Sequence, residues 1–215
     1  VDNTLGISVE KVIVHQTRGG GGFGRPLVND PMCEAAAIAQ RVNAPVQLMW
    51  TRADDLAHDL YRPGGFHALT GAVDAAGKIA AWQDHLITFT ADGTGAVSGG
   101  GVSEHEFPTY QLPNYRLGMT LLPLATPCGA WRAPGSNVTA WVIQSFIHEL
   151  AVASGRDHVD FLLDIMGEPQ WLQPGNAGAL HTGRAAGVIR LAAEKAGWGS
   201  QLPSGRGLGL AFHFS

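Results

Sequence analysis

Residues 18–25, Arg-Gly-Gly-Gly-Gly-Phe-Gly-Arg, constrain the fold more than any other stretch of the chain. Glycine has no Cβ, so this backbone can turn its N–H groups inward and approach a bulky ligand closely. The arginines at both ends suit phosphate. We therefore expect residues 20–25, the glycine loop, to seat an anionic cofactor. A mobile surface connector is the alternative, because glycine clusters also mark flexible segments.

The segments around the glycine loop predict a β–loop–α–β unit. Residues 11–16 form a short β-type run before the loop. After it, Asn29 or Asp30 can cap a helix over residues 30–42. Residues 46–51 predict a buried strand that follows the helix.

The rest of the chain predicts an α+β fold, with a mixed sheet and packed helices. Strands and helices are recognised by apolar residues recurring at every second position or at helical spacing. Ser136 or Asn137 can cap the principal core helix, and Gly155 can end it. We expect a hairpin of strands over 66–73 and 78–90 with a turn at 74–77, a strand over 117–122, a surface loop or lid over 91–101, helices over about 157–166 and 184–196, and a final strand over 208–214.

Composition limits the possible partners. The chain has 215 residues, of which 45% are hydrophobic, so a sizeable core is expected. The net charge is −4 and lysine occurs only as Lys11, Lys78 and Lys195. No basic face can follow a nucleic-acid backbone, so nucleic acid is not an expected partner. No apolar run approaches the roughly 20 residues that a membrane span needs.

Two common metal motifs do not match. Asp54 and His58 can share a helical face, but zinc needs a third firm ligand and hard cations need more oxygens. His148 and Glu149 form half of H-E-x-x-H, but Val152 stands where the second histidine belongs. The cysteines show no C-x-x-C spacing either. No metal ligand set is therefore expected in the chain.

A dinucleotide-binding loop is also a weak match. Gly19, Gly21 and Gly24 formally fit G-x-G-x-x-G, but Pro26 delays the helix that should contain the third glycine. The expected strand over residues 46–51 has no acidic residue at its end to hold a ribose. A Rossmann-type domain remains a weaker alternative, and it would require a parallel sheet.

A second loop resembles the first in design. Residues 129–135, the tryptophan loop, place Trp131 beside Arg132, much as the glycine loop places Phe23 near Arg25. Both loops run towards the N-terminus of an expected helix. Two such loops can hold a cofactor from opposite sides through backbone N–H groups and guanidinium groups.

Several ordered motifs together resemble the molybdopterin-binding large subunit of the xanthine dehydrogenase/aldehyde oxidase family, in the branch typified by isoquinoline 1-oxidoreductase. The likeness spans nearly the whole chain. The motifs are Gly20-Gly21-Gly22-Phe23-Gly24, Trp50-Thr51-Arg52-Ala53-Asp54-Asp55, Asp59-Leu60-Tyr61-Arg62-Pro63, Tyr110-x-x-Pro113-Asn114-x-Arg116, and Trp131-Arg132 followed by Gln144-Ser145-Phe146-Ile147-His148-Glu149-Leu150-Ala151.

The resemblance implies an oxidoreductase that hydroxylates aldehydes or N-heterocycles with oxygen taken from water. It implies a molybdopterin cofactor, in its cytosine dinucleotide form, whose molybdenum has no protein ligand. It also implies that electrons leave through iron–sulfur clusters on a separate subunit. By this likeness the cofactor-binding residues are Gly20, Gly21, Gly22, Phe23, Gly24 and Arg25 in the glycine loop, and Ala130, Trp131 and Arg132 in the tryptophan loop.

The chain also departs from the family pattern. The family's general base is a glutamate in a Gly-x-Gly-Glu setting, which these residues lack. We therefore expect residues 1–215 to be the central fragment of one domain, truncated at both ends, without cofactor and inactive alone. Leu27 stands where purine-oxidising members carry a glutamate, so purine is not an expected substrate. The competing class is a non-catalytic interaction or folding domain.

Overall fold

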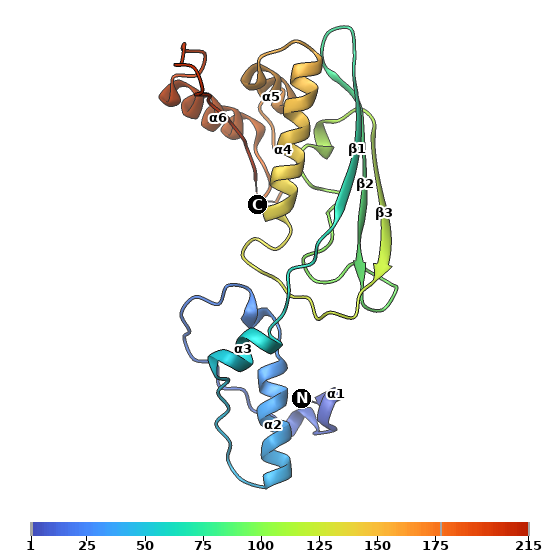
Figure 1. Cartoon of the computed structure of the whole chain (residues 1–215), viewed down its shortest axis with the longest axis vertical. Coiled ribbons are helices and arrows are strands. Elements are labelled where there is room, and N and C mark those ends of the chain that lie inside the picture. The colour runs from blue at the N-terminus through green and yellow to red at the C-terminus, as the bar shows by residue number, and fades with distance from the viewer. Residues whose placement is uncertain (1, 177, 215) are drawn as a thin grey trace.

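The computed structural model describes residues 2–176 and 178–214, and Figure 1 shows an elongated molecule with two parts. The N-terminal part, residues 2–60, lies at one end. The C-terminal part, residues 61–214, holds the sheet and the remaining long helices. The elements are α1 (Asp2–Leu5), α2 (Asp30–Val42), α3 (Arg52–His58), β1 (Phe66–Val73), β2 (Ile79–Thr90), β3 (Tyr115–Pro123), α4 (Ser136–Ala153), α5 (His158–Met166) and α6 (Thr182–Ala196).

The sheet is mixed, as predicted. Its order is β1-β2-β3, with β1 antiparallel to β2 and β2 parallel to β3. The hairpin turn forms because the Asp74 carboxylate accepts hydrogen bonds from the backbone N–H groups of Ala76 and Lys78, both at 2.9 Å. Gly77 completes it with a left-handed φ of 73°. The antiparallel hairpin rules out the fully parallel sheet of the Rossmann alternative.

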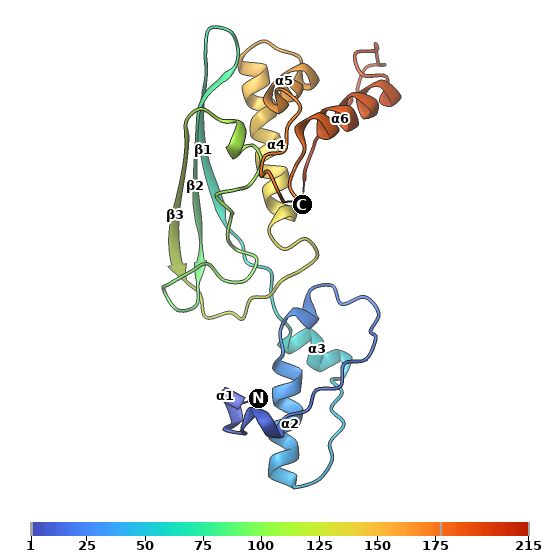
Figure 2. The same ribbon diagram turned by 180° about the vertical axis from the view of Figure 1, so that it is seen from behind.

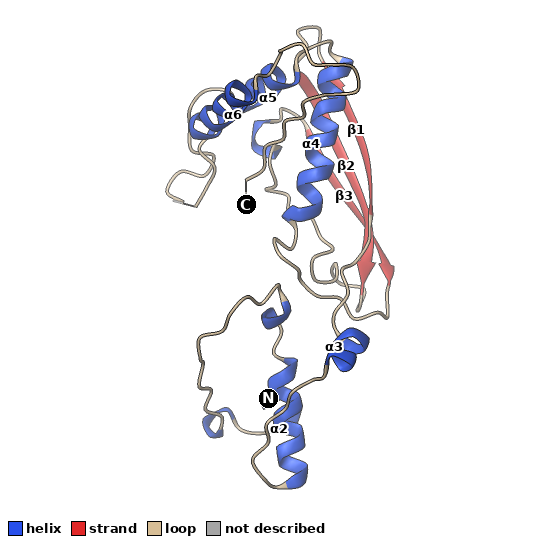
Figure 3. Cartoon of the chain, turned by 60° about the vertical axis from the view of Figure 1, so that its left-hand side comes forward, coloured by secondary structure: helices blue, strands red, loops and turns tan. Residues whose placement is uncertain are grey.

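Helix α4 covers one face of the sheet (Figure 3) and supplies the centre of the core. Ile147 is fully buried, and Phe146 meets Trp82 of β2 edge to face at 4.6 Å between ring centroids. Gly71 allows this close packing, because a Cβ there would lie 3.0 Å from side-chain atoms of both Phe146 and Leu150. Each fully buried aliphatic or aromatic side chain contributes about 1.5–3 kcal/mol.

The helix ends follow the sequence in part. Asn29 occupies the N-cap position of α2, but its side chain makes no capping hydrogen bond, so that predicted cap is wrong. Asp157 caps α5 by accepting from the N–H groups of Val159 and Asp160. Gly155 follows α4 with a φ of 67°, as expected. The predicted cap of α4 is wrong: Gly135 occupies the N-cap position without a side-chain hydrogen bond, because the chain enters the helix one residue earlier than predicted.

Three predicted strands are absent from the described residues. Residues 11–16, 46–51 and 208–214 belong to no sheet, so the β–loop–α–β unit does not form. A strand requires a neighbouring backbone to supply its hydrogen bonds, and the described part of the chain offers these segments none. Helices α2 and α3 contain no buried residue, whereas the core cluster lies entirely in the C-terminal part.

Within the ranges 2–176 and 178–214, no helix has both the length and the apolar composition required to cross a membrane.

Candidate functional site: the junction of two loops

The glycine loop and the tryptophan loop meet where the two parts of the molecule join (Figure 2). Gly24 packs directly on the backbone of the second loop. A Cβ added at Gly24 would lie 2.6 Å from the carbonyl carbon of Ala130 and 2.9 Å from Cα of Trp131. Only glycine allows this approach without displacing backbone. The two loops therefore touch at this point.

Both loops hold a non-glycine residue in a left-handed conformation. Phe23 has a φ of 51° and Ala133 a φ of 50°, and the adjacent Gly24 has a φ of 96°. For a residue other than glycine, the left-handed conformation costs on the order of 1–3 kcal/mol, and it persists where the surrounding structure enforces it. Such conformations concentrate at ligand sites, so their occurrence in both loops supports a binding role for the junction.

The loops present backbone donors that the described residues do not use. Within the described structure, the backbone N–H groups of residues 19–24 and 130–133 donate no hydrogen bond. Space is open above the first glycines, because a Cβ at Gly19 or Gly20 would meet nothing within 4 Å. An anionic or oxygen-rich ligand can satisfy such donors.

Arg25 is an anchor of the glycine loop. Its Nη1 and Nη2 atoms donate to the two carboxylate oxygens of Asp30, each at 2.7 Å, and Nε pairs with Asp59 at 2.7 Å. Its guanidinium also lies 5.6 Å from the ring centroid of Trp50. The hydrogen bond to Asp30 raises the pKa of Arg25 and lowers the pKa of Asp30. Because Arg25 is engaged by two carboxylates, a direct bond to phosphate would have to compete with them.

The other side chains proposed for the site face solvent. Phe23 is 74% exposed and Trp131 57% exposed. Arg132 is also exposed and takes part in no ion pair among the described residues. The two aromatic rings and this arginine are therefore accessible to a ligand.

The residues of the two metal motifs occupy other roles or positions in the structure. Asp54 is used in a capping box with Thr51, at the start of α3. Hydrogen bonds from Thr51 lower the pKa of Asp54. His148 and Glu149 lie on the exposed face of α4. No group of three or more His, Cys, Asp or Glu side chains gathers in the part of the chain that the structure describes.

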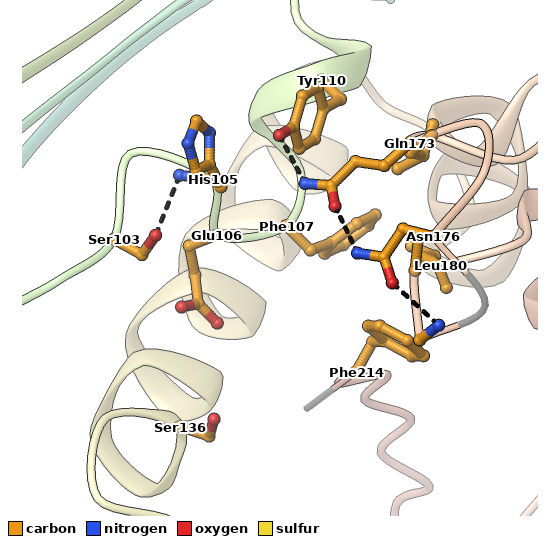
Figure 4. A pocket seen from close by; sticks show the side chains of 13 residues that line it. Ser103, His105, Glu106, Phe107, Tyr110, Ser136, Gln173, Asn176, Leu180 and Phe214 are labelled. Carbon is orange, nitrogen blue, oxygen red and sulfur yellow. Dashed lines mark hydrogen bonds between the residues drawn. The ribbon is translucent and has the colours of Figure 1, made fainter.

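Sequence patterns gave no sign of a cavity of about 220 Å³ between residues 103–110, the start of α4 and residues 172–176 and 178–180 (Figure 4). The amide of Gln173 donates to the Tyr110 hydroxyl at 2.7 Å and accepts from Asn176 at 2.8 Å. Burial raises the pKa of the Glu106 carboxyl, and His213 Nε2 lies 3.7 Å from it. The lining residues come from distant segments and belong to no motif, so only the fold assembles them.

The comparisons with known proteins identify the class of domain to which this fold belongs. Residues 1–163 match the molybdopterin cofactor-binding domain family. The chain belongs to this family. The crystal structure of quinoline 2-oxidoreductase from Pseudomonas putida 86 matches with a TM-score of 0.63 and 16% identity, over 83% of this chain and 24% of that one. At this identity the match shows the shared fold.

Three relatives of known name are aldehyde or isoquinoline oxidoreductases. The membrane-bound aldehyde dehydrogenase [pyrroloquinoline-quinone] of Gluconacetobacter polyoxogenes is 28% identical over 97% of this chain and 29% of its own length. The aldehyde oxidoreductase molybdenum-binding subunit PaoC of Escherichia coli K12 is 30% identical over 91% of this chain and 26% of its own. The isoquinoline 1-oxidoreductase subunit beta of Brevundimonas diminuta is 38% identical over 34% of this chain and 9% of its own. The resemblance inferred from the motifs is confirmed. The chain spans less than a third of the length of these relatives.

The junction fits the family's cofactor. Molybdopterin carries phosphate and ring heteroatoms, which accept hydrogen bonds, and the two loops offer unused N–H donors on adjoining backbones. The residues present can therefore hold such a group.

Proposed function

We propose that this chain is the cofactor-holding part of a molybdenum hydroxylase that oxidises aldehydes or N-heterocycles with oxygen from water. The observation that carries the proposal is the backbone contact between Gly24 and Ala130, which joins the two loops in a chain of this family. When bound, the molybdenum cofactor supplies the redox and oxygen-transfer chemistry. The residues of the chain bind and orient it.

The roles of the residues divide between the loops. In the glycine loop, Gly20, Gly21, Gly22, Phe23 and Gly24 offer backbone N–H groups. In the tryptophan loop, Ala130 and Trp131 offer N–H groups from the other side, and Arg132 contributes a guanidinium free to pair with phosphate. Arg25 holds the glycine loop through Asp30 and Asp59. A cytosine dinucleotide form of the cofactor would add a diphosphate suited to Arg132.

The catalytic base is proposed to lie outside these residues. No Gly-x-Gly-Glu sequence occurs in the 215 residues, so we predict that the chain alone does not turn over. Because these residues supply only part of the cofactor's surroundings, we also predict that the chain alone does not retain cofactor. In the complete enzyme, electrons would pass to an iron–sulfur subunit. Measurable aldehyde oxidation by the 215-residue chain would contradict this part of the proposal.

The test is the cofactor content of the full-length gene product, purified from a molybdenum-replete host. We expect about one molybdenum by elemental analysis and one fluorescent pterin per polypeptide. Their joint absence would favour the competing class, a non-catalytic domain whose loops shape a protein interface. A bound quinone in place of pterin, suggested by the name of the Gluconacetobacter relative, would also contradict the proposal.

A further inference from the structure

The four residues that connect the two parts of the molecule, 59–62, touch both loops. Asp59 follows α3 in an extended conformation, with φ −73° and ψ 172°. Its carboxylate pairs with Nε of Arg25 at 2.7 Å and accepts from the N–H of Leu60 at 2.8 Å. At the start of the connector, Asp59 therefore binds Arg25 at the end of the glycine loop.

The middle of the connector pairs with the tryptophan loop through backbone. The N–H of Tyr61 donates to the carbonyl of Pro127 at 2.9 Å, and the N–H of Gly129 donates to the carbonyl of Tyr61 at 3.1 Å. Gly129 permits this approach, because a Cβ there would lie 2.6 Å from Cβ of Leu60. The pairing is an isolated parallel bridge between Tyr61 and Cys128.

At the end of the connector, Arg62 binds the C-terminal side of the tryptophan loop. Nη2 of Arg62 donates to the carbonyl of Pro134 and, at 2.8 Å, to Oδ1 of Asn137. The same guanidinium packs against Gly99, where a Cβ would lie 3.0 Å from Cζ. Burial lowers the pKa of Arg62. The carbonyl it binds directly follows Ala133, the residue with the left-handed φ.

The order of these contacts suits an extended segment. Residues three apart in such a segment point to opposite sides, and they are about 10 Å apart along the chain. Asp59 and Arg62 can therefore each reach a different loop while the backbone between them pairs with residues 127–129.

We propose that residues 59–62 form a clamp that fixes the spacing of the two loops, with Asp59 and Arg62 as positioning residues for the cofactor. This inference rests on the proposed function and deepens it. The clamp acts through loop backbone, so its loss should release cofactor while the core of the C-terminal part, which contains none of these residues, stays folded.

The test uses the full-length gene product with Asp59→Ala, Arg62→Met and Arg62→Lys. Arg52→Met and Asp160→Ala are matched controls, because both side chains are exposed and contact neither loop. We measure molybdenum and pterin per polypeptide, the amide exchange rates of Tyr61 and Gly129, and the thermal unfolding midpoint. In Asp59→Ala and Arg62→Met, the cofactor content should fall at least about fivefold, and the amides of Tyr61 and Gly129 should exchange at least about tenfold faster. The thermal unfolding midpoint should stay within about 3 °C of that of wild type.

Arg62→Lys should recover at least about half of the cofactor content, because an ammonium group can donate to both acceptors of the arginine. The clamp is refuted if Asp59→Ala and Arg62→Met hold as much cofactor as loaded wild type. It is also refuted if the two control variants lose as much cofactor as these two variants, or if cofactor loss only follows a fall in the unfolding midpoint. Wild type without molybdenum or pterin would refute the proposed function instead, and the amide exchange rates would still test the clamp.

Discussion

Replacing Gly24 by alanine would insert a methyl group where the two loops touch. The residue would have to keep a φ of 96°, which costs an L residue about 1–2 kcal/mol. Its Cβ would also overlap the backbone at Ala130 and Trp131, at 2.6 and 2.9 Å, and forced overlap of this kind adds about 1–2 kcal/mol. We therefore expect the closed junction to lose about 2–4 kcal/mol.

The assay is hydrogen exchange at the amides of Tyr61 and Gly129, whose hydrogen bonds join the connector to the tryptophan loop. A loss of about 2 kcal/mol corresponds to roughly 30-fold faster exchange, and larger losses to more. Gly20→Ala is the matched control, since nothing lies within 4 Å of a Cβ there and φ is not left-handed. It should change exchange by less than about threefold. Equal exchange rates in the two variants would refute the reasoning that Gly24 closes the junction.

Two further predictions concern the C-terminal part. Phe161 is 1% exposed, whereas Phe66 is 73% exposed. Phe161→Ala should therefore lower the free energy of unfolding, measured in urea, by about 3–5 kcal/mol, and Phe66→Ala should lower it by under about 1 kcal/mol. Equal losses in the two variants would contradict the assigned core. Burial raises the pKa of Glu106, so the folded state retains its proton to higher pH and stability falls as pH rises through that pKa. Glu106→Gln should therefore stabilise the protein at pH 7 relative to wild type, and this gain in stability should be smaller at pH 4. A gain that is larger at pH 4 than at pH 7 would contradict a raised pKa at Glu106.

The sequence predicted locally determined elements well. Helix α2 has the predicted bounds Asp30–Val42, and the β1–β2 hairpin turns at the predicted Asp74. Helical hydrogen bonds join residues four apart, and the Asp74 turn is closed by its own side chain. Such signals need no distant partner.

The sequence did not predict which strands pair with one another. Residues 11–16 and 46–51 have the apolar composition of strands, but the described structure gives neither a neighbouring strand. Conversely, β3 joins β2 in parallel after a long connection, and nothing in either segment indicated this pairing. Strand formation depends on which backbones the fold brings together.

The candidate site was partly predictable for the same reason. The glycine and tryptophan loops were recognisable because their residue types and order resemble those of a family. Their contact at Gly24 required the fold, and so did the finding that Arg25 is held by Asp30 and Asp59. The residues of the clamp lie within a recognised motif, Asp59 to Pro63, but the motif gave no indication that its two ends hold different loops.

The most direct test of the account is to locate molybdenum in crystals of the loaded full-length protein by anomalous scattering at the molybdenum absorption edge. We predict one strong peak beside the junction of the glycine and tryptophan loops, next to Gly22 and Phe23. A peak elsewhere in the molecule, such as in the cavity beside Glu106, would contradict the claim that these two loops form the cofactor site.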